Sequence, residues 1–182
     1  MRVIDTAISD VKIIEPRVFG DERGFFVETW NQKIFREHGL DINFVQDNYS
    51  RSKKGTLRGL HYQMVRPQGK LVRVVVGSVF DVAVDMRRSS PSFGKSVCIE
   101  LSAENHRTVW IPPGFAHGFL VLSESADFIY KCTDFYLPEH ERSLLWNDPQ
   151  LAILWPIIED RELILAPKDA NGKPLQTADC YE

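Results

Sequence analysis

Short apolar runs, interrupted every few positions by turn-forming residues, are the dominant pattern of this chain. The runs are rich in Val, Ile, Phe and Tyr, while Gly, Pro, Asn and Ser separate them. Short strands joined by short turns are typical of an all-β sandwich or barrel. The predicted strands are RVIDTAI, VKIIEPRVF, GFFVETW, FVQDNYS, GTLRGLHYQ, KLVRVVVG, SVFDVAVDMR, KSVCIELS, HRTVWIPP, HGFLVLS and DFIYKCTDFY.

Helix signals are few. NQKIFREHG predicts one short helix, with Asn31 as its N-cap and Gly39 as its stop, and DPQLAILW before Pro156 is a second candidate. From Pro167 onwards the chain is rich in turn formers and is expected to pack as a tail. With 182 residues and no linker or repeat, residues 1–182 are expected to form a single domain.

Composition and charge exclude several classes of protein. A net charge of -3 argues against a broad basic face for nucleic acid, although a few local arginines suffice for a small anionic ligand. The longest apolar run, LAILWPII at 151–158, is far too short to span a bilayer. The cysteines at 98, 132 and 180 are odd in number and far apart, which favours a reducing compartment. We expect a cytoplasmic protein without a nucleic-acid or membrane partner.

Two of the five histidines lie in apolar, strand-like surroundings, namely His61 in TLRGLHYQ and His117 in PPGFAHGF. The latter contains P-x-G-x-x-H, half of the metal-binding pattern of cupin β-barrels. The other half would need a second histidine where this chain has Gln63, and no Glu follows before the next strand. Because an amide is a poor ligand for transition metals, the sequence predicts a cupin-like barrel without a metal site.

Without a metal, His61 is a candidate general base, because imidazole titrates near neutrality. A base needs an acceptor that orients its second ring nitrogen, and a carboxylate serves best. The pattern alone leaves Asp81, Asp85, Asp148 and Asp169 open for this role. It also leaves open a core histidine that only bonds a backbone carbonyl.

Cations inside the apolar runs favour the catalytic interpretation. Arg58, Lys70 and Arg73 lie in or beside predicted strands, where burial of an unpaired charge is costly. Three cations near one histidine in an acidic chain indicate an anionic ligand. The DERG segment with Arg23, by contrast, is an ordinary hairpin turn on pattern grounds alone.

The chain resembles the dTDP-4-dehydrorhamnose 3,5-epimerase family, cofactor-free enzymes that act on a sugar nucleotide. The resemblance extends from about Val18 to Ala170. Its order and spacing of motifs are specific, and the matching stretches are VFGDERGFFVETWN, FVQDNYSRSKKGTLRGLHYQ, QGKLVRVVVGSVFDVAVDMRRSSPSFG, LSAENHRTVWIPPGFAHGF, YKCTDFYLPEHE, LLWNDP and PKDA. It implies a jelly-roll, cupin-like fold and a homodimer whose N-terminal strands are exchanged between subunits.

Residue by residue, the resemblance implies a base at His61 oriented by Asp169, an acid at Tyr130 and an enolate-stabilising cation at Lys70. The implied substrate contacts on the remaining elements are Arg23, Phe26, Glu28, Gln46, Asn48, Arg58, His117 and Tyr136. The first three of these are implied to reach the site of the partner subunit.

The implied reaction is inversion at C3 and C5 of dTDP-4-dehydro-6-deoxy-D-glucose, in the route to dTDP-L-rhamnose. The C4 ketone acidifies the protons on both carbons, so one base can serve both without a cofactor. No G-x-G-x-x-G motif for a nicotinamide is present. Three alternatives stay open from the sequence: an epimerase of one centre only, a metal-dependent cupin, and a nucleotide-sugar binder without activity.

Overall fold

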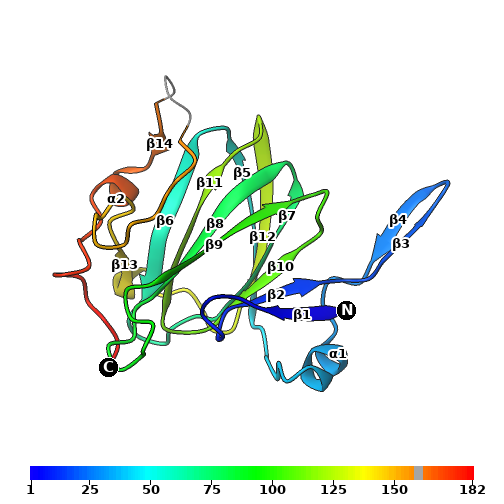
Figure 1. Cartoon of the computed structure of the whole chain (residues 1–182), viewed down its shortest axis with the longest axis horizontal. Helices are drawn as coiled ribbons and strands as arrows, with labels where there is room; N and C mark the ends of the chain where they lie inside the picture. Colours follow the sequence, from blue (N-terminus) through cyan, green and yellow to red (C-terminus); the bar gives the residue numbers. More distant parts are fainter. Residues whose placement is uncertain (158–161) are drawn as a thin grey trace.

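Two antiparallel sheets face each other in the computed structural model of the chain, which describes residues 1–157 and 162–182 (Figure 1). The first sheet has six strands in the order β1-β2-β10-β7-β12-β5. Their bounds are β1 Arg2–Asp5, β2 Lys12–Glu15, β10 Thr108–Ile111, β7 Lys70–Val76, β12 Ser125–Cys132 and β5 Gln46–Lys53. This is the jelly-roll, cupin-like arrangement that the strand pattern and the resemblance predict.

The second sheet follows the order β13-β6-β11-β8-β9, and β14 adds to β6 in parallel. Its strands are β13 Glu141–Ser143, β6 Thr56–Gln63, β11 Phe115–Val121, β8 Ser78–Asp85, β9 Ser96–Ser102 and β14 Ile164–Leu165. Most strands that neighbour each other here are far apart in sequence, as β6 and β11 illustrate, whereas β8 and β9 are consecutive. Side chains from both sheets therefore meet in one interior.

The apolar core lies between the sheets. Val72, Val74 and Phe128 from the first sheet pack against Phe119 and Val121 from the second. Alternation along β8 places Val82 and Val84 on the opposite face of the second sheet, where they meet Leu144, Leu151 and Ala178 of the C-terminal region. Both faces of the second sheet are thus covered by packed side chains.

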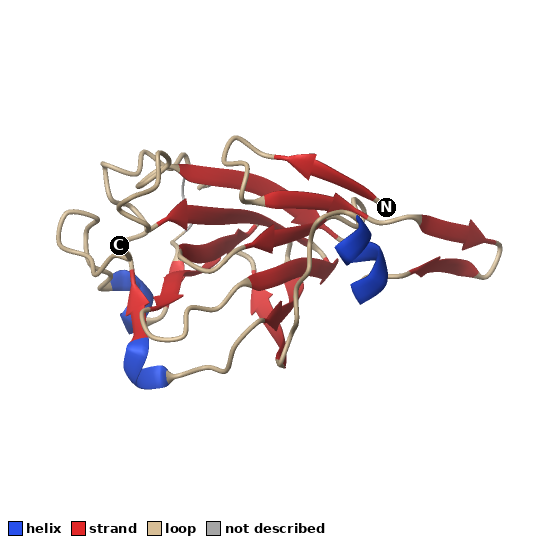
Figure 2. Ribbon diagram, turned by 90° about the horizontal axis from the view of Figure 1, so that it is seen from below, coloured by secondary structure: helices blue, strands red, loops and turns tan. Residues whose placement is uncertain are grey.

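Helices are short and peripheral (Figure 2). Helix α1, Gln32–Glu37, confirms the prediction: the Asn31 side chain accepts from the amides of Lys33 and Ile34, and Gly39 has φ +80°. It buries Phe35 in a third cluster that includes Trp110 on the outer face of the first sheet. A 3-10 turn, η1 Pro138–His140, precedes β13.

The prediction of a second helix in DPQLAILW is wrong. Residues 149–151 form a turn and Ala152 adopts φ +49°, which a right-handed helix does not tolerate. The Asp148 carboxylate binds the amides of Gln150 and Leu175 instead, and Trp155 packs on Phe80. The segment has no regular secondary structure and packs on the second sheet, and the last residue of LAILWPII lies outside the described residues.

Two boundaries also differ from the expectation. VKIIEPRVF is two strands, because the chain leaves the sheet at Pro16, which has no N–H for a ladder. The second half forms β3, Val18–Asp21, which pairs only with β4, Gly24–Val27, as a two-stranded arm that extends from the body of the molecule (Figures 1 and 2). The expected turn-rich tail begins with a short helix, α2 Pro167–Ala170.

Among the described residues, no helix is long and apolar enough to cross a membrane.

Candidate active site

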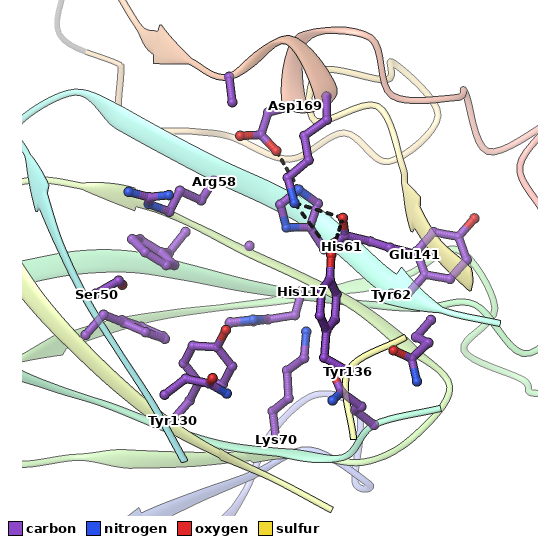
Figure 3. A pocket seen from close by; sticks show the side chains of 18 of the residues that line it. Ser50, Arg58, His61, Tyr62, Lys70, His117, Tyr130, Tyr136, Glu141 and Asp169 are labelled. Atoms are coloured by element: carbon purple, nitrogen blue, oxygen red, sulfur yellow. Dashed lines mark hydrogen bonds and ion pairs between the residues drawn. The ribbon is translucent and has the colours of Figure 1, made fainter. Parts of the chain in front are cut away.

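A cavity of about 410 Å³ opens between the two sheets (Figure 3). It brings together most of the residues singled out in the sequence, although they come from separate strands, loops and one helix. The lining includes Gln46, Asn48, Arg58, His61, Lys70, His117, Tyr130, Tyr136 and Asp169.

The two sheets contribute different chemistry to this cavity. His61 and Arg58 lie on β6 of the second sheet, whereas Tyr130 on β12 and Lys70 on β7 belong to the first. A ligand held between the sheets therefore has the imidazole on one side and the phenol and ammonium on the other (Figure 3).

An irregularity between β6 and β11 explains how Arg58 and His61 both reach the cavity. Strict alternation would send residues three positions apart to opposite faces of a strand. The register with β11 shifts, so that His61 pairs with His117 but Arg58 pairs with Phe119. The extra residue in β6 turns both polar side chains inward, as β-bulges near active sites commonly do.

Glycines at this irregularity allow a close approach of the two strands. Gly59 has φ +122°, and a Cβ there would lie 2.5 Å from Cα of Gly118. A Cβ on Gly118 would in turn lie 2.5 Å from the carbonyl oxygen of Arg58. Both positions therefore require glycine if β6 is to keep its path.

His61 forms a hydrogen bond with Asp169, with 2.5 Å between Nε2 and Oδ1. Asp169 is 2% exposed, is carried by α2, and also accepts weakly from the amide of Gly59. Burial favours the neutral carboxyl, but the hydrogen bond and charge of His61 outweigh it and hold the pKa of Asp169 below its ordinary value. With Nε2 donating to this carboxylate, Nδ1 is the nitrogen that carries the lone pair.

The other carboxylates that the sequence left open serve elsewhere. Asp85 accepts from Arg87 and two serines, and Asp148 accepts from backbone amides. Asp81 pairs with His117, with 2.8 Å between Oδ2 and Nε2, and both side chains are buried. His117 is thus a second oriented imidazole in the cavity wall.

Lys70 and Tyr130 lie on the paired strands β7 and β12, where Lys70 is opposite Cys132 and Tyr130 is opposite Val72. Burial lowers the pKa of the Lys70 ammonium, against the opposing influence of Cys132, Glu141 and Asp81. Burial also raises the pKa of the Tyr130 phenol to about 12. The phenol therefore keeps its proton at any physiological pH and can act as a proton donor.

One of the predicted cations, Arg73, does not reach the cavity. Lys70, Val72 and Val74 alternate with Leu71, Arg73 and Val75 along β7. Since Val72 and Val74 face the interior, Arg73 lies on the outer face of the first sheet. The expectation that Arg73 lies near His61 is therefore wrong. Arg58 and Lys70 remain as cavity cations on these strands.

Arg23, Phe26 and Glu28 lie outside this cavity within one chain. Arg23 is at the tip of the arm and pairs with Asp21, Phe26 is 67% exposed, and Glu28 accepts from Asn31. The arm and α2 lie at opposite ends of the molecule (Figure 1).

Two charged residues escaped the sequence analysis. The Glu141 carboxylate accepts from Lys168, with Nζ to Oε2 of 2.9 Å, and from the Tyr136 hydroxyl at 3.2 Å (Figure 3). Both residues line the cavity, and Lys168 directly precedes Asp169 on α2. PEHER and PKDA look like polar surface turns in sequence, so only the adjacent position of Asp169 could have pointed to Lys168.

The described residues contain no group of three or more His, Cys, Asp or Glu side chains placed to hold a metal ion. Gln63, at the position of the second cupin histidine, uses its amide for hydrogen bonds to backbone atoms.

Comparison with known proteins gives one consistent result. The family model described as dTDP-4-dehydrorhamnose 3,5-epimerase matches residues 5–177. The chain is 59% identical over 182 residues to the enzyme of that name from Pseudomonas aeruginosa, covering 100% of this chain and 99% of that protein. The corresponding protein of Methanothermobacter thermautotrophicus is 51% identical over 180 residues, covering 99% and 97%.

Solved structures agree. A Legionella pneumophila 3,5-epimerase in complex with dTDP-4-keto-L-rhamnose superposes with a TM-score of 0.94 at 57% identity, covering 98% of this chain and 94% of that one. A 3'-monoepimerase from Streptomyces bikiniensis in complex with dTDP-quinovose gives a TM-score of 0.88 at 35% identity, covering 95% and 87%. The chain is an isomerase that belongs to the dTDP-4-dehydrorhamnose 3,5-epimerase family.

Proposed function

We propose that this protein inverts C3 and C5 of dTDP-4-dehydro-6-deoxy-D-glucose to give dTDP-4-dehydro-L-rhamnose, without a cofactor, in dTDP-L-rhamnose biosynthesis. The observation that carries the proposal is the pair of His61 and Asp169 on one wall of the cavity, opposite Tyr130 and Lys70. A base and an acid on opposite sides of a ring are what inversion at a carbon requires.

The first step is removal of a proton next to the ketone. Nδ1 of His61 takes the proton from C5, and the electrons of the C–H bond move to the C4 carbonyl as an enolate. Asp169 keeps the imidazole oriented and stabilises the cation that forms. Lys70 supplies a fixed positive charge where the negative charge develops, which is usually the largest catalytic contribution.

The second step returns a proton to the opposite face. Tyr130 donates its phenolic proton to C5, the enolate electrons reform the ketone, and solvent exchange restores both residues. The same base then serves C3 after the ring presents that carbon. Gln46, Asn48 and Arg58 hold the nucleotide and its diphosphate, because guanidinium groups match phosphate oxygens, and binding of this remote part orients the sugar.

The active form in this proposal is a homodimer with exchanged N-terminal arms. Phe19, Phe25 and Phe26 are half-exposed or more on an arm of only two strands, which is marginal by itself. In the dimer, the arm brings Arg23, Phe26 and Glu28 to the partner's cavity, where Phe26 and Tyr136 flank the thymine and ribose. The three cysteines are free thiols, which suits the reducing cytoplasm.

Deuterium incorporation tests the reaction. In D₂O the enzyme should place deuterium at both C3 and C5 of the sugar, with inversion at both, as read by NMR. Exchange and inversion at one carbon only would instead assign the protein to the single-centre epimerases, whose fold it shares. Absence of exchange with intact nucleotide binding would identify a binder without activity.

A further inference from the structure

Tyr136 lies in a segment that has no regular secondary structure. Strand β12 ends at Cys132 and η1 begins at Pro138, so the backbone between them takes no part in a sheet ladder. The Tyr136 side chain lines the cavity and is 45% exposed. Something other than backbone pairing must fix this segment if the ring is to have one position.

Glutamine side chains supply these missing bonds. Gln63 Oε1 accepts from the amide of Leu137 at 2.8 Å, and Gln63 Nε2 donates to the carbonyl of Phe135 at 3.2 Å. The residues on both sides of Tyr136 are therefore tied to the same side chain. Gln46 Oε1 accepts from the amide of Tyr136 itself at 3.0 Å.

Gln63 is itself held in place by further hydrogen bonds. Nε2 also donates to the carbonyls of Val65 and Arg66 at 2.9 and 2.8 Å, and the backbone carbonyl of Gln63 accepts from the Tyr181 hydroxyl at 2.7 Å. The residue is 4% exposed. Its polar atoms are therefore engaged with the protein, and it acts on a ligand through the segment that it holds.

We propose that Gln63 is a positioning residue that fixes Tyr136 as a wall for the nucleotide end of the substrate, an inference that rests on the proposed function. The position that supplies a metal ligand in other cupin-like barrels here supplies an amide that organises binding. A side chain with both a donor and an acceptor is needed, because the segment presents an N–H on one side of Tyr136 and a C=O on the other.

Gln63→Glu is the sharpest variant, because it keeps the shape and the acceptor but removes the donor. The carboxylate faces the three carbonyl oxygens and repels them, so Tyr136 loses its fixed position. Since stacking of a base on an aromatic ring contributes to nucleotide affinity, we expect the Kd for dTDP and the KM to rise about tenfold, with kcat within about threefold. Gln150→Glu, the same change at an exposed glutamine, should leave all three unchanged.

The pH dependence separates positioning from general damage. A buried carboxyl among carbonyl oxygens has a raised pKa, and in its protonated form it can donate again. The Kd of Gln63→Glu should therefore approach the wild-type value as the pH falls, whereas Gln63→Met, which cannot titrate, should stay weak at every pH.

A double-mutant cycle addresses the route through the tyrosine. Tyr136→Ala alone should weaken dTDP binding, and Gln63→Glu should then add nothing further. Additive losses, an effect on kcat alone, or wild-type affinity in Gln63→Glu would each overturn the inference. If the wild type neither binds dTDP nor turns over, the proposed function fails instead.

Hydrogen exchange provides a test that uses only the wild-type protein and does not depend on whether a variant folds. The amide of Leu137 should exchange slowly although it lies outside any strand or helix, because Gln63 accepts from it. Exchange at the rate of a free loop would refute the positioning role.

Discussion

At the scale of single residues, the fold sets the protonation of the groups that carry the proposed chemistry. Asp169 remains a carboxylate because His61 outweighs its burial, and Tyr130 remains a phenol because burial raises its pKa to about 12. The pKa of Lys70 is lowered, since burial disfavours its charged form. The base partner is thus held charged and the acid held neutral, as general acid–base catalysis at neutral pH requires.

The dyad of His61 and Asp169 is expected to affect catalysis and not nucleotide binding. Asp169→Asn keeps the shape but removes the charge that stabilises the His61 cation, so kcat should fall by about 10²–10⁴-fold. The Kd for dTDP, measured by calorimetry, should change by less than about threefold, because the nucleotide contacts are untouched. Asp41→Asn, an exposed carboxylate beside Arg36, is the matched control and should retain the wild-type rate. Near-normal turnover of the Asp169 variant would remove the dyad from the mechanism.

The pKa shifts predict which group limits the rate in alkali. Lys70 loses its proton as the pH rises through its lowered pKa, so kcat/KM should decline below the ordinary lysine value of about 10.4. Tyr130 keeps its proton until about pH 12 and contributes nothing to this decline.

The measurement is the pH–rate profile for deuterium incorporation. The rate of Tyr130→Phe should be lower at every pH but should decline at the same pH as the wild type. In Lys70→Arg the decline should occur at a higher pH. A decline that disappears in Tyr130→Phe would assign it to the phenol instead.

At the scale of elements, the irregular pairing of β6 with β11 decides the site. It turns Arg58 and His61 to one side although they are three residues apart, and β13 and α2 then bring Glu141 and Asp169 to them. Gly59 and Gly118 make this possible because a Cβ on either residue would clash with the backbone of the other.

Gly118→Ala should therefore damage both stability and activity. The added Cβ meets the backbone of Arg58 and Gly59, which cannot move without shifting β6. We expect a loss of about 2–4 kcal/mol in the free energy of unfolding, measured by urea denaturation, and a lower kcat. Glu100→Ala, an exposed change on β9 of the same sheet, is the control and should alter stability little. Unchanged stability of Gly118→Ala would show that the strands adjust freely.

At the scale of the whole molecule, one chain has a cavity between its sheets and exposed aromatic side chains on β3 and β4. These two strands form an arm that extends away from the body (Figure 1). An exposed apolar surface on a two-stranded extension supports the proposed association of two subunits. The proposed exchange of arms satisfies both features at once, because each arm then closes the cavity of the other subunit.

Mixed dimers test the exchange. An Arg23→Ala/Phe26→Ala chain and a His61→Asn chain should each be weakly active alone. Mixed in equal amounts after subunit exchange, they should recover about a quarter of wild-type activity, because half of the dimers then have one intact site.

The control is a mixture of a His61→Asn chain with an Asp169→Asn chain. Each of these substitutions damages the cavity of its own chain, so no mixed dimer has an intact site and no activity should be recovered. Lack of recovery in the first mixture, with mixed dimers verified by mass spectrometry, would contradict the exchange.

Local pattern determined much of this protein by itself. Alternation, turn residues and the Asn31 cap depend on neighbours in the chain, so the strands and α1 were predictable without a fold. DPQLAILW was mistaken for a helix because its apolar residues are used against the second sheet, a contact that no local pattern encodes.

Only the tertiary structure decided which polar residues share one cavity. Four aspartates were open as partners of His61, and pairing over 108 positions selected Asp169. The same packing sent Arg73 outward, brought Glu141 and Lys168 inward, and gave Gln63 a segment to hold. The sequence fixes periodicity because that depends on neighbouring residues, whereas sheet order and register, which place distant side chains together, depend on the packing of the entire chain.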